Sequence, residues 1–299
     1  MSFRSLFAIA ESLDEVHSPS RGPLTQGTIF SGVKALNYDH CTAHGIVITA
    51  RCDVANDKVN SYSFLPIVSL SDWIQRDGRI ILAERMMSSA KGRLRDLLRD
   101  SGNSPSVLET ESLDRIREIL FPVGAKNKKL DGLRKQFDDN AQRFQLAQRA
   151  LDSTPEERLC NEVVSSMPSL KDVLVKELTT YRLNGYYFLK RLNPGGADSG
   201  FVVLLREVGM LPRSVAMAVA EGLDQSQFVE LCKNDSSLSG KMLINEDDFA
   251  MPIGVLASPN IEHLMQTFSY LFGRIGINDH EPSYVSALWD RQPSAKETK

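Results

Sequence analysis

The chain has 299 residues, 42% of them hydrophobic, and a formal net charge of −3. That length and composition provide enough apolar surface for a full core and predict more than one domain. The charge balance excludes a protein that is strongly basic over its whole surface, as many nucleic-acid-binding proteins are, and no run of about 18 apolar residues is present to cross a bilayer.

The cysteine content indicates a reducing compartment. There are four cysteines, and the first twenty residues lack the sustained apolar stretch and cleavage site of a secretory signal. Because disulfides are rare in the cytosol, these thiols are expected to be free or metal-bound. We therefore expect a cytoplasmic protein that is not bound to a membrane.

Residues 1–84 predict a small β-rich domain with an N-terminal helix. The helical spacing covers residues 5–16. Short β-rich runs follow at 27–33, 45–53 and 59–70. The apolar triplet 46–48 is typical of a strand buried on both faces, and the turn residues Asn56 and Asp57 predict a hairpin to the next strand. A small sheet or barrel is the expected result.

Residues 85–153 predict a helical connector. Apolar residues recur three and four apart in 113–120 and in 130–151, while the stretch 121–129 between them is expected to be exposed. Residues 85–150 contain 14 Lys or Arg against 9 Asp or Glu. A pair of solvated amphipathic helices explains this pattern. The alternative is a nucleic-acid-binding arm, which requires the basic side chains to converge on one side.

Residues 154–299 predict a C-terminal α+β domain. Thr154 and Pro155 are typical of a helix start. Two β-rich runs, 185–192 and 200–208, flank a Gly- and Pro-rich turn and predict a hairpin. Helical segments are expected at 212–223 and 225–232, and an irregular or weakly extended stretch at 241–256. The whole chain is therefore expected to be an α+β protein.

The last helix, predicted over 258–276, has the clearest pattern in the chain. Ser258 is expected to cap it and Pro259 to take its first position. Its apolar stripe, which should pack in a core, consists of Ile261, Leu264, Met265, Phe268, Leu271, Phe272 and Ile275. The opposite face carries His263, Gln266, Tyr270 and Arg274, which form either a binding surface or a solvated face.

Four of the nine Cys and His residues lie within thirteen positions, as His40, Cys41, His44 and Cys52. Zinc takes four N or S ligands, and Cys41, His44 and Cys52 could supply three. The fourth ligand would have to be Asp53 or a distant residue such as His280. This zinc site is one of three interpretations of the cluster.

The second interpretation is catalytic. Cys52 would be a thiolate nucleophile with His44 as its base, and Lys58 or Arg51 would lower the thiol pKa beside Asp53. In the third, Cys52 is a small buried hydrophobic residue and Asp53 caps a turn, with no chemistry.

Motifs of the common nucleotide-dependent and hydrolytic enzymes are missing. The sequence contains no G-x-x-x-x-G-K-[ST], G-x-G-x-x-G, H-E-x-x-H or G-x-S-x-G. The acidic run 245–249 lacks the spaced oxygen ligands of a calcium loop. A nucleotide-driven motor and a typical hydrolase are therefore not expected, and no cofactor is expected apart from the zinc alternative.

The stretches "QGTIF" at 26–30, "IVITARCDVANDKV" at 46–59 and "SPNIEHLMQTFSYLFGRIGI" at 258–277 resemble an uncharacterised group of bacterial proteins. That group has a Q-G-D-I start, a "VVIS-x-x-CD" strand and a C-terminal "SP-x-x-E-H-L" helix; here Thr28 stands at the acidic position. The order of "GTIF", "GIVITARCDVANDKV" and "FLPIVSL" also resembles the PemK-like toxin barrel. That resemblance implies a small SH3-like barrel in the N-terminal part.

These observations favour a bacterial cytoplasmic accessory or regulatory protein that binds a protein partner. One alternative is a nucleic-acid hydrolase of a stress or phage-defence system acting at Cys52 and Asp53, with nucleic acid bound by 85–150. The other is a zinc-stabilised binding domain without catalysis. The sequence leaves the oligomeric state open.

Overall fold

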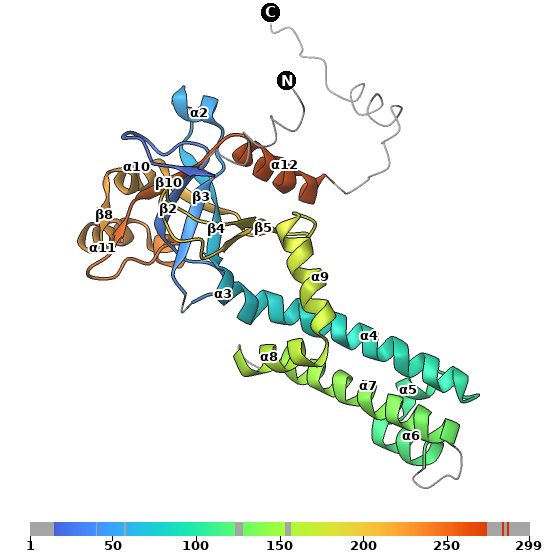
Figure 1. Ribbon diagram of the computed structural model, residues 1–299. Helices are drawn as coiled ribbons and strands as arrows, with labels where there is room; N and C mark the ends of the chain where they lie inside the picture. The colour runs from blue at the N-terminus through green and yellow to red at the C-terminus, as the bar shows by residue number, and fades with distance from the viewer. Residues whose placement is uncertain are drawn as a thin grey trace, which may run out of the picture.

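The computed structural model describes residues 15–39, 41–56, 58–122, 128–152 and 157–273, together with Ser283 and Ser286. It is an α+β protein in which an antiparallel sheet curls into half a barrel and is joined by several helices (Figure 1). The predicted fold class is therefore confirmed. The helix expected at 5–16 and the helix start expected at 154 fall mainly outside the described residues.

The main sheet joins strands from both ends of the chain. Its order is β1-β10-β2-β3-β4-β6-β5, with β7 pairing with the first half of β4, and all its pairs are antiparallel. The strands are β1 (Val16–His17), β2 (Thr28–Val33), β3 (Ala43–Val47), β4 (Ser61–Ser69), β5 (Tyr186–Leu189), β6 (Phe201–Leu204), β7 (Gly209–Pro212) and β10 (Pro252–Leu256). The segments 1–84 and 154–299 thus share one sheet, because β4 pairs with β6 and β7.

Both faces of this sheet are covered, as the apolar triplet at 46–48 predicts. Neighbouring side chains along a strand point to opposite faces, and they enter two different cores. One core contains Ile29, Ile46, Leu65 and Val203, and the other contains Phe30, Val47, Phe64 and Val202. Ile46 and Val47 are fully buried.

Gly45 lets β3 approach the aromatic side chain of β2. A Cβ at this position would lie 2.5 Å from Cζ of Phe30, well inside van der Waals contact. The Phe30 ring in turn packs edge-on against Phe64, with ring centroids 5.5 Å apart. The glycine is therefore needed for the central packing of the half-barrel.

The predicted hairpins are present, but the connection after β3 differs from the prediction. The strand expected over 45–53 ends at Val47, and residues Arg51–Ala55 form a short helix, α2. Its residues 51–53 are exposed, so they have no apolar neighbours that would hold a strand. The Asn56 side chain donates to the Cys52 carbonyl at 2.6 Å and closes the helix. Beyond α2, β4 pairs with β3 as predicted, and β5 pairs with β6.

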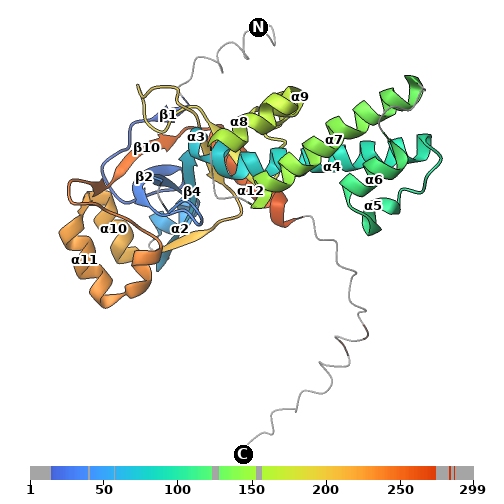
Figure 2. The same ribbon diagram turned by 90° about the horizontal axis from the view of Figure 1, so that it is seen from below.

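A helical arm extends from the end of β4. The chain passes through α3 (Leu70–Trp73) and a π-helix (Ile74–Gly78) into α4 (Arg79–Asp100), α5 (Val107–Thr110), α6 (Leu113–Leu120) and α7 (Lys128–Asp152). We call α4 to α7 the arm. In Figures 1 and 2, α4 and α7 lie side by side and lead away from the sheet, with α5 and α6 at the far end. The helices predicted at 113–120 and 130–151 are confirmed.

The arm has a core of its own. Leu94, Leu98, Ile116, Phe121 and Phe137 are buried there, and the rings of Phe121 and Phe137 lie 5.0 Å apart. The expectation that the whole linker 121–129 is exposed is wrong at Phe121, because this ring packs into that core. Residues 123–127 lie outside the described part.

The chain returns to the sheet through two helices and closes with four more helical segments. These are α8 (Glu157–Ser166), α9 (Pro168–Thr179), α10 (Arg213–Glu221), α11 (Gln225–Asn234), a 3-10 helix (Ser236–Gly240) and α12 (Asn260–Phe272). Two short strands, β8 (Leu223–Asp224) and β9 (Phe249–Ala250), pair with each other. Among the described residues, no helix is both long enough and apolar enough to cross a membrane.

The C-terminal helix is shorter than predicted. Pro259 occupies the cap position and no cap from the Ser258 side chain is found, so the helix begins at Asn260. It ends before Gly273, a residue type that favours helix ends, whereas Ile275 and Gly276 lie outside the described residues. Ile261 and Leu264 are buried against the sheet, as the apolar stripe predicts.

Candidate functional site

Three of the four residues predicted as a binding face line one groove. His263, Gln266 and Tyr270 of α12 face the chain between α9 and β5 across a hollow of about 490 Å³. The opposite wall is formed by residues 181–185. Arg274, the fourth predicted residue, lies outside the described residues. We call this hollow the α12 groove.

The spacing of these residues along α12 explains why they share the groove. Positions 263, 266 and 270 recur at intervals of three and four and so lie on one helix face. Because Ile261 and Leu264 hold the other face against the sheet, this face is left to solvent. Tyr270 is 64% exposed, so most of its ring surface is open to a partner.

Two aromatic residues that line the groove, Tyr181 and His263, pack against the buried Tyr187. The rings of Tyr181 and Tyr187 lie 4.5 Å apart and 27° from parallel, and the His263 ring meets Tyr181 edge-on at 4.8 Å. The Tyr187 hydroxyl donates to the Asn260 carbonyl at 3.3 Å and lies 3.2 Å from Nδ1 of His263. Burial raises the pKa of both phenols, so they remain neutral hydrogen-bonding groups.

The backbone of Tyr181 is strained. α9 ends in a Schellman motif, in which the amide of Arg182 donates to Glu177 and that of Tyr181 donates to Leu178. This motif places Tyr181 in the left-handed region, at φ 57°, where glycine is the usual residue. A bulky residue there costs about 1–2 kcal/mol. Strain of this kind is found at binding sites that need a particular side chain.

A second cavity adjoins the α12 groove and was not predicted from the sequence. Arg182, Leu183 and Asn184 line both hollows, and the second has a volume of about 750 Å³. It lies at the base of the arm, between α4, the end of α9 and β5. Its central contact is a hydrogen bond of 3.0 Å from the Tyr186 hydroxyl to Oδ2 of Asp77.

No local pattern in the sequence points to this cavity. Its residues come from four separate segments, and Asp77 sits in the π-helix, the one π-helical segment of the described chain. A π turn inside a longer helix often marks a functional position. The only sequence signal would have been two tyrosines in a row after a glycine, at 185–187, and this is too common to identify a site.

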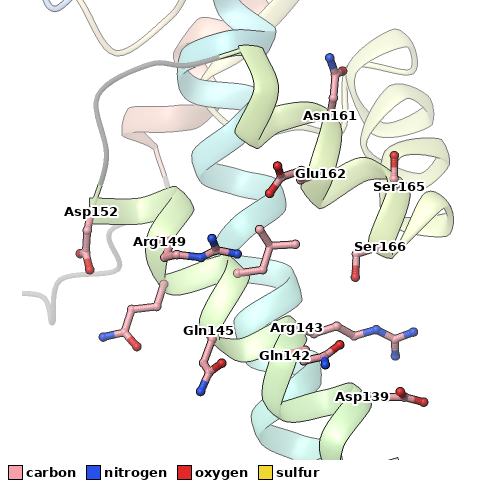
Figure 3. Close-up of a pocket in the computed structure, with 12 residues that line it drawn as sticks. Asp139, Gln142, Arg143, Gln145, Arg149, Asp152, Asn161, Glu162, Ser165 and Ser166 are labelled. Carbon is pink, nitrogen blue, oxygen red and sulfur yellow. The ribbon is translucent and has the colours of Figure 1, made fainter.

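A third hollow is an open polar groove between α7 and α8. Its volume is about 1330 Å³. Figure 3 shows Gln142 and Gln145 on the α7 wall and Ser165 and Ser166 on the α8 wall. The charged side chains that line it are Asp139, Arg143, Arg149, Asp152 and Glu162. With two cations and three anions it is not the positive surface that a nucleic-acid-binding arm requires.

Five arginines of the arm form ion pairs with carboxylates of the arm. Arg117 and Arg134 both contact Asp138, at 2.7 and 3.8 Å. Further ion pairs join Arg95 to Glu109, Arg99 to Asp96 and Arg115 to Glu111. Both interpretations of residues 85–150, solvated helices and a nucleic-acid-binding arm, stay predictions.

The predicted catalytic residues are only partly brought together. Cys52 and Asp53 are exposed on α2, with the thiol 3.7 Å from Oδ1 of Asp53, and the exposed Lys58 donates its backbone amide to the Asp53 carbonyl. His44 pairs with Ile67 near the far end of β4. Six residues separate His44 from the start of α2, which lies beyond the other end of β3. The expected pocket containing all these groups is therefore not formed.

The predicted zinc ligands are separated in the same way. Cys41 and His44 lie before or at the start of β3, whereas Cys52 lies on α2 beyond its end. Within the part of the chain that is described, no three His, Cys, Asp or Glu side chains are grouped so that they could hold a metal ion. His40 and His280 lie outside that part.

His44 is instead a largely buried imidazole. Its Nδ1 has no hydrogen-bond partner among the described residues, and the Phe201 ring lies edge-on at 6.3 Å. Burial lowers the pKa of this imidazole. Its surroundings therefore favour the neutral ring.

Comparisons with protein-family models, with curated proteins and with solved structures found no match to this chain. The resemblance to an uncharacterised bacterial group and to the PemK-like barrel thus stays a prediction. The function has to be argued from the geometry of the groove.

Proposed function

We propose that this protein is a bacterial cytoplasmic accessory protein that binds a partner protein in the α12 groove. The observation that carries this proposal is the convergence of His263, Gln266 and Tyr270 with the strained Tyr181 in one hollow. Tyr181, whose backbone is strained, lies in one wall of the groove, and the exposed Tyr270 lies in the opposite wall.

The lining of the groove fits a segment of polypeptide. Tyr181 and Tyr270 offer flat apolar surface with little conformational entropy to lose, and tyrosine is enriched in protein interfaces. Gln266 and Asn184 offer amide donors and acceptors that match a peptide backbone. Arg182 at the rim would pair with a carboxylate. The expected partner segment therefore carries an aromatic or aliphatic side chain next to an acidic residue.

Two other functions have less support. A nucleic-acid hydrolase acting at Cys52 and Asp53 would need a base, and His44 lies at the other end of β3. A nucleic-acid-binding arm would need free cations on one side, and Arg117 and Arg134 share Asp138. No observation of the described residues favours a zinc-stabilised domain over the protein-binding one.

Site-specific photocrosslinking in the native cell tests the proposal. The full-length chain would carry p-benzoylphenylalanine in place of Tyr270, and in a control in place of Ile119, which is 62% exposed at the far end of the arm. We expect a discrete covalent adduct from position 270 and none of the same mass from position 119. Equal adducts from both positions, or none from position 270, would contradict the proposal.

A second variant separates binding from folding. In Tyr181→Gly, the glycine adopts φ 57° without strain, and this offsets part of the packing lost with the ring. The free energy of unfolding should change by less than about 1.5 kcal/mol, while the adduct from position 270 disappears. If the adduct persists in Tyr181→Gly, the groove is not the binding site.

A further inference from the structure

A cluster of polar side chains lies beside the cavity at the base of the arm. Asp77, on the π-helix, accepts a hydrogen bond from the Tyr186 hydroxyl on β5. Tyr38, from the loop after β2, is only 5% exposed, and its hydroxyl has no hydrogen-bond partner among the described residues. A buried hydroxyl without a partner is costly. The group nearest to relieving this cost is Asp77, whose carboxylate is close enough for a side-chain hydrogen bond to contribute to the raised pKa of Tyr38.

The hydroxyl of Tyr38 belongs to the same cluster as Asp77. The charge of Asp77 and the phenol of Tyr186 both help to raise the pKa of Tyr38, after burial. The guanidinium of Arg76 lies 5.3 Å from the Tyr38 ring centre. A carboxylate and two phenols from three separate segments thus meet at one point.

Two hollows are lined by residues of this cluster. Besides the cavity of about 750 Å³, a smaller one of about 190 Å³ is lined by Tyr38, and both are lined by Asp77, Tyr186 and Arg206. The backbone is adapted to this arrangement. Gly185 has φ +94°, and a Cβ there would lie 2.8 Å from Nε of Arg206. The glycine therefore makes room for the guanidinium beside the tyrosine.

The larger cavity has walls of opposite charge. Asp77 and Glu84 are seven residues apart on the helical wall, which places them on one face. Arg182 and Arg206 line the opposite wall, formed by the chain flanking β5 and β6. The remaining ionised pair, Arg85 and Glu177, is joined by a salt bridge of 2.5 Å and neutralises itself. Asp77 also lies 3.9 Å from Arg76, a cation that is not part of the lining, so the lining itself carries two carboxylates on the helical wall and two guanidinium groups on the other wall.

We propose that this cavity binds a small zwitterionic ligand of the free amino acid class, with its ammonium group toward Asp77 and its carboxylate toward Arg206. A dication would meet the two arginines and a phosphate would meet the two carboxylates, so each would be repelled by one wall. A ligand with both charges satisfies both walls. The proposal does not rest on partner binding in the α12 groove.

The apolar part of the lining selects among amino acids. Ile80, Ile81 and Leu183 line the same cavity, so an aliphatic side chain has a surface to pack against. Burying such a side chain contributes about 1.5–3 kcal/mol. L-leucine is therefore the probe of choice, and a strongly polar amino acid of similar size should bind more weakly.

Calorimetric titration of the full chain with three probes tests the proposal. L-leucine carries both charges, L-leucinamide only the cation, and N-acetyl-L-leucine only the anion. Because a hydrogen bond to a charged group contributes about 1.5–3 kcal/mol, we expect each single-charge probe to bind at least about tenfold more weakly than leucine. Failure of leucine to bind, or equal binding of either analogue, would overturn the proposal.

Variants locate the site. Asp77→Asn and Arg206→Gln should each weaken leucine binding at least about tenfold, whereas Asp96→Asn, on the exposed surface of α4, should leave it unchanged. Tyr186→Phe removes only the hydroxyl that donates to Asp77, and it should weaken leucine binding severalfold. Because this change is milder, it tests the site even if Asp77→Asn or Arg206→Gln fails to fold. If Asp77→Asn and Tyr186→Phe are both folded and bind leucine as the unmodified chain does, the cavity is not the site.

Discussion

The hydroxyl of Tyr187, on the edge strand β5, lies 3.2 Å from Nδ1 of His263 on α12. A phenol has one proton to donate, and when this proton goes to the Asn260 carbonyl the oxygen is left to accept from an Nδ1–H of His263. The contact joins the terminal helix to the strand next to the arm. It therefore ties α12 to β5, the strand that directly follows the 181–185 wall of the α12 groove.

Removing this hydroxyl should loosen the terminal helix. Tyr187→Phe keeps the stacked ring but leaves the Asn260 carbonyl and the imidazole without their partner, at a cost of about 1–2 kcal/mol. Urea unfolding measures the change. Tyr270→Phe is the matched control, because its hydroxyl is on an exposed side chain, and its free energy of unfolding should change by less than about 0.5 kcal/mol. Equal effects of the two variants would contradict the role assigned to Tyr187.

Two glycine substitutions should have opposite effects. Gly45→Ala places a methyl group 2.5 Å from the Phe30 ring, and such overpacking of a core costs about 1–3 kcal/mol. Gly92 lies on an exposed face of α4 with no atom within 4 Å of an added Cβ. Gly92→Ala should therefore stabilise the protein by about 0.5–1 kcal/mol. Thermal unfolding of both variants checks the prediction, which fails if Gly45→Ala is neutral.

The buried imidazole of His44 should make stability depend on pH. Burial holds its folded-state pKa below the ordinary value of 6.5, so at lower pH the unfolded chain binds the proton more readily. Its contribution to stability is present above pH 6.5 and is lost as the pH falls through the lowered folded pKa. His44→Leu should therefore show a smaller loss of unfolding free energy between pH 7 and pH 5, measured in urea at each pH.

His17 supplies the control for that experiment, because its side chain is exposed at the end of β1. His17→Gln should retain the pH dependence of the unmodified chain. A His44→Leu variant that keeps the full pH dependence would show that other groups cause it.

The four thiols should differ in reactivity. Cys52 is exposed on α2, whereas Cys160 is 4% exposed. Burial raises the pKa of Cys41, with a smaller effect of Asp72 in the same direction, and this reduces its thiolate fraction. In the folded protein at neutral pH, a maleimide should label Cys52 first and Cys160 only after unfolding, as peptide mass mapping would show. Labelling of Cys160 at the rate of Cys52 would contradict the described burial.

Local patterns predicted the elements whose contacts are local. The helix at 113–120, the long helix near 130–151 and the hairpin of β5 and β6 were found because apolar spacing and turn residues specify them without reference to the rest of the chain. The same holds for the face of α12, since the stripe that buries Ile261 and Leu264 also fixes where His263 and Gln266 point.

Features that depend on distant segments could not be predicted. The pairing of β4 with β6 joins residues that precede and follow the arm in the chain. The sequence of neither strand specifies which other strand it pairs with. The cluster of His44 with Cys52 looked compact in sequence, but an extended strand separates its members. The cavity around Asp77 requires the π-helix and the tyrosines of two remote segments, and none of these has a sequence signature.

The position of the arm between paired strands also bears on how the chain folds. Ser69 pairs with Phe201, about 130 residues later, and closing so long a loop from a random chain is entropically costly and slow. A helical hairpin that nucleates around Phe121 and Phe137 before the strands meet would shorten that search. We therefore expect Phe137→Ala to slow the formation of the main sheet, although the Phe137 side chain packs in the core of the arm. The refolding rate in stopped-flow experiments measures this effect.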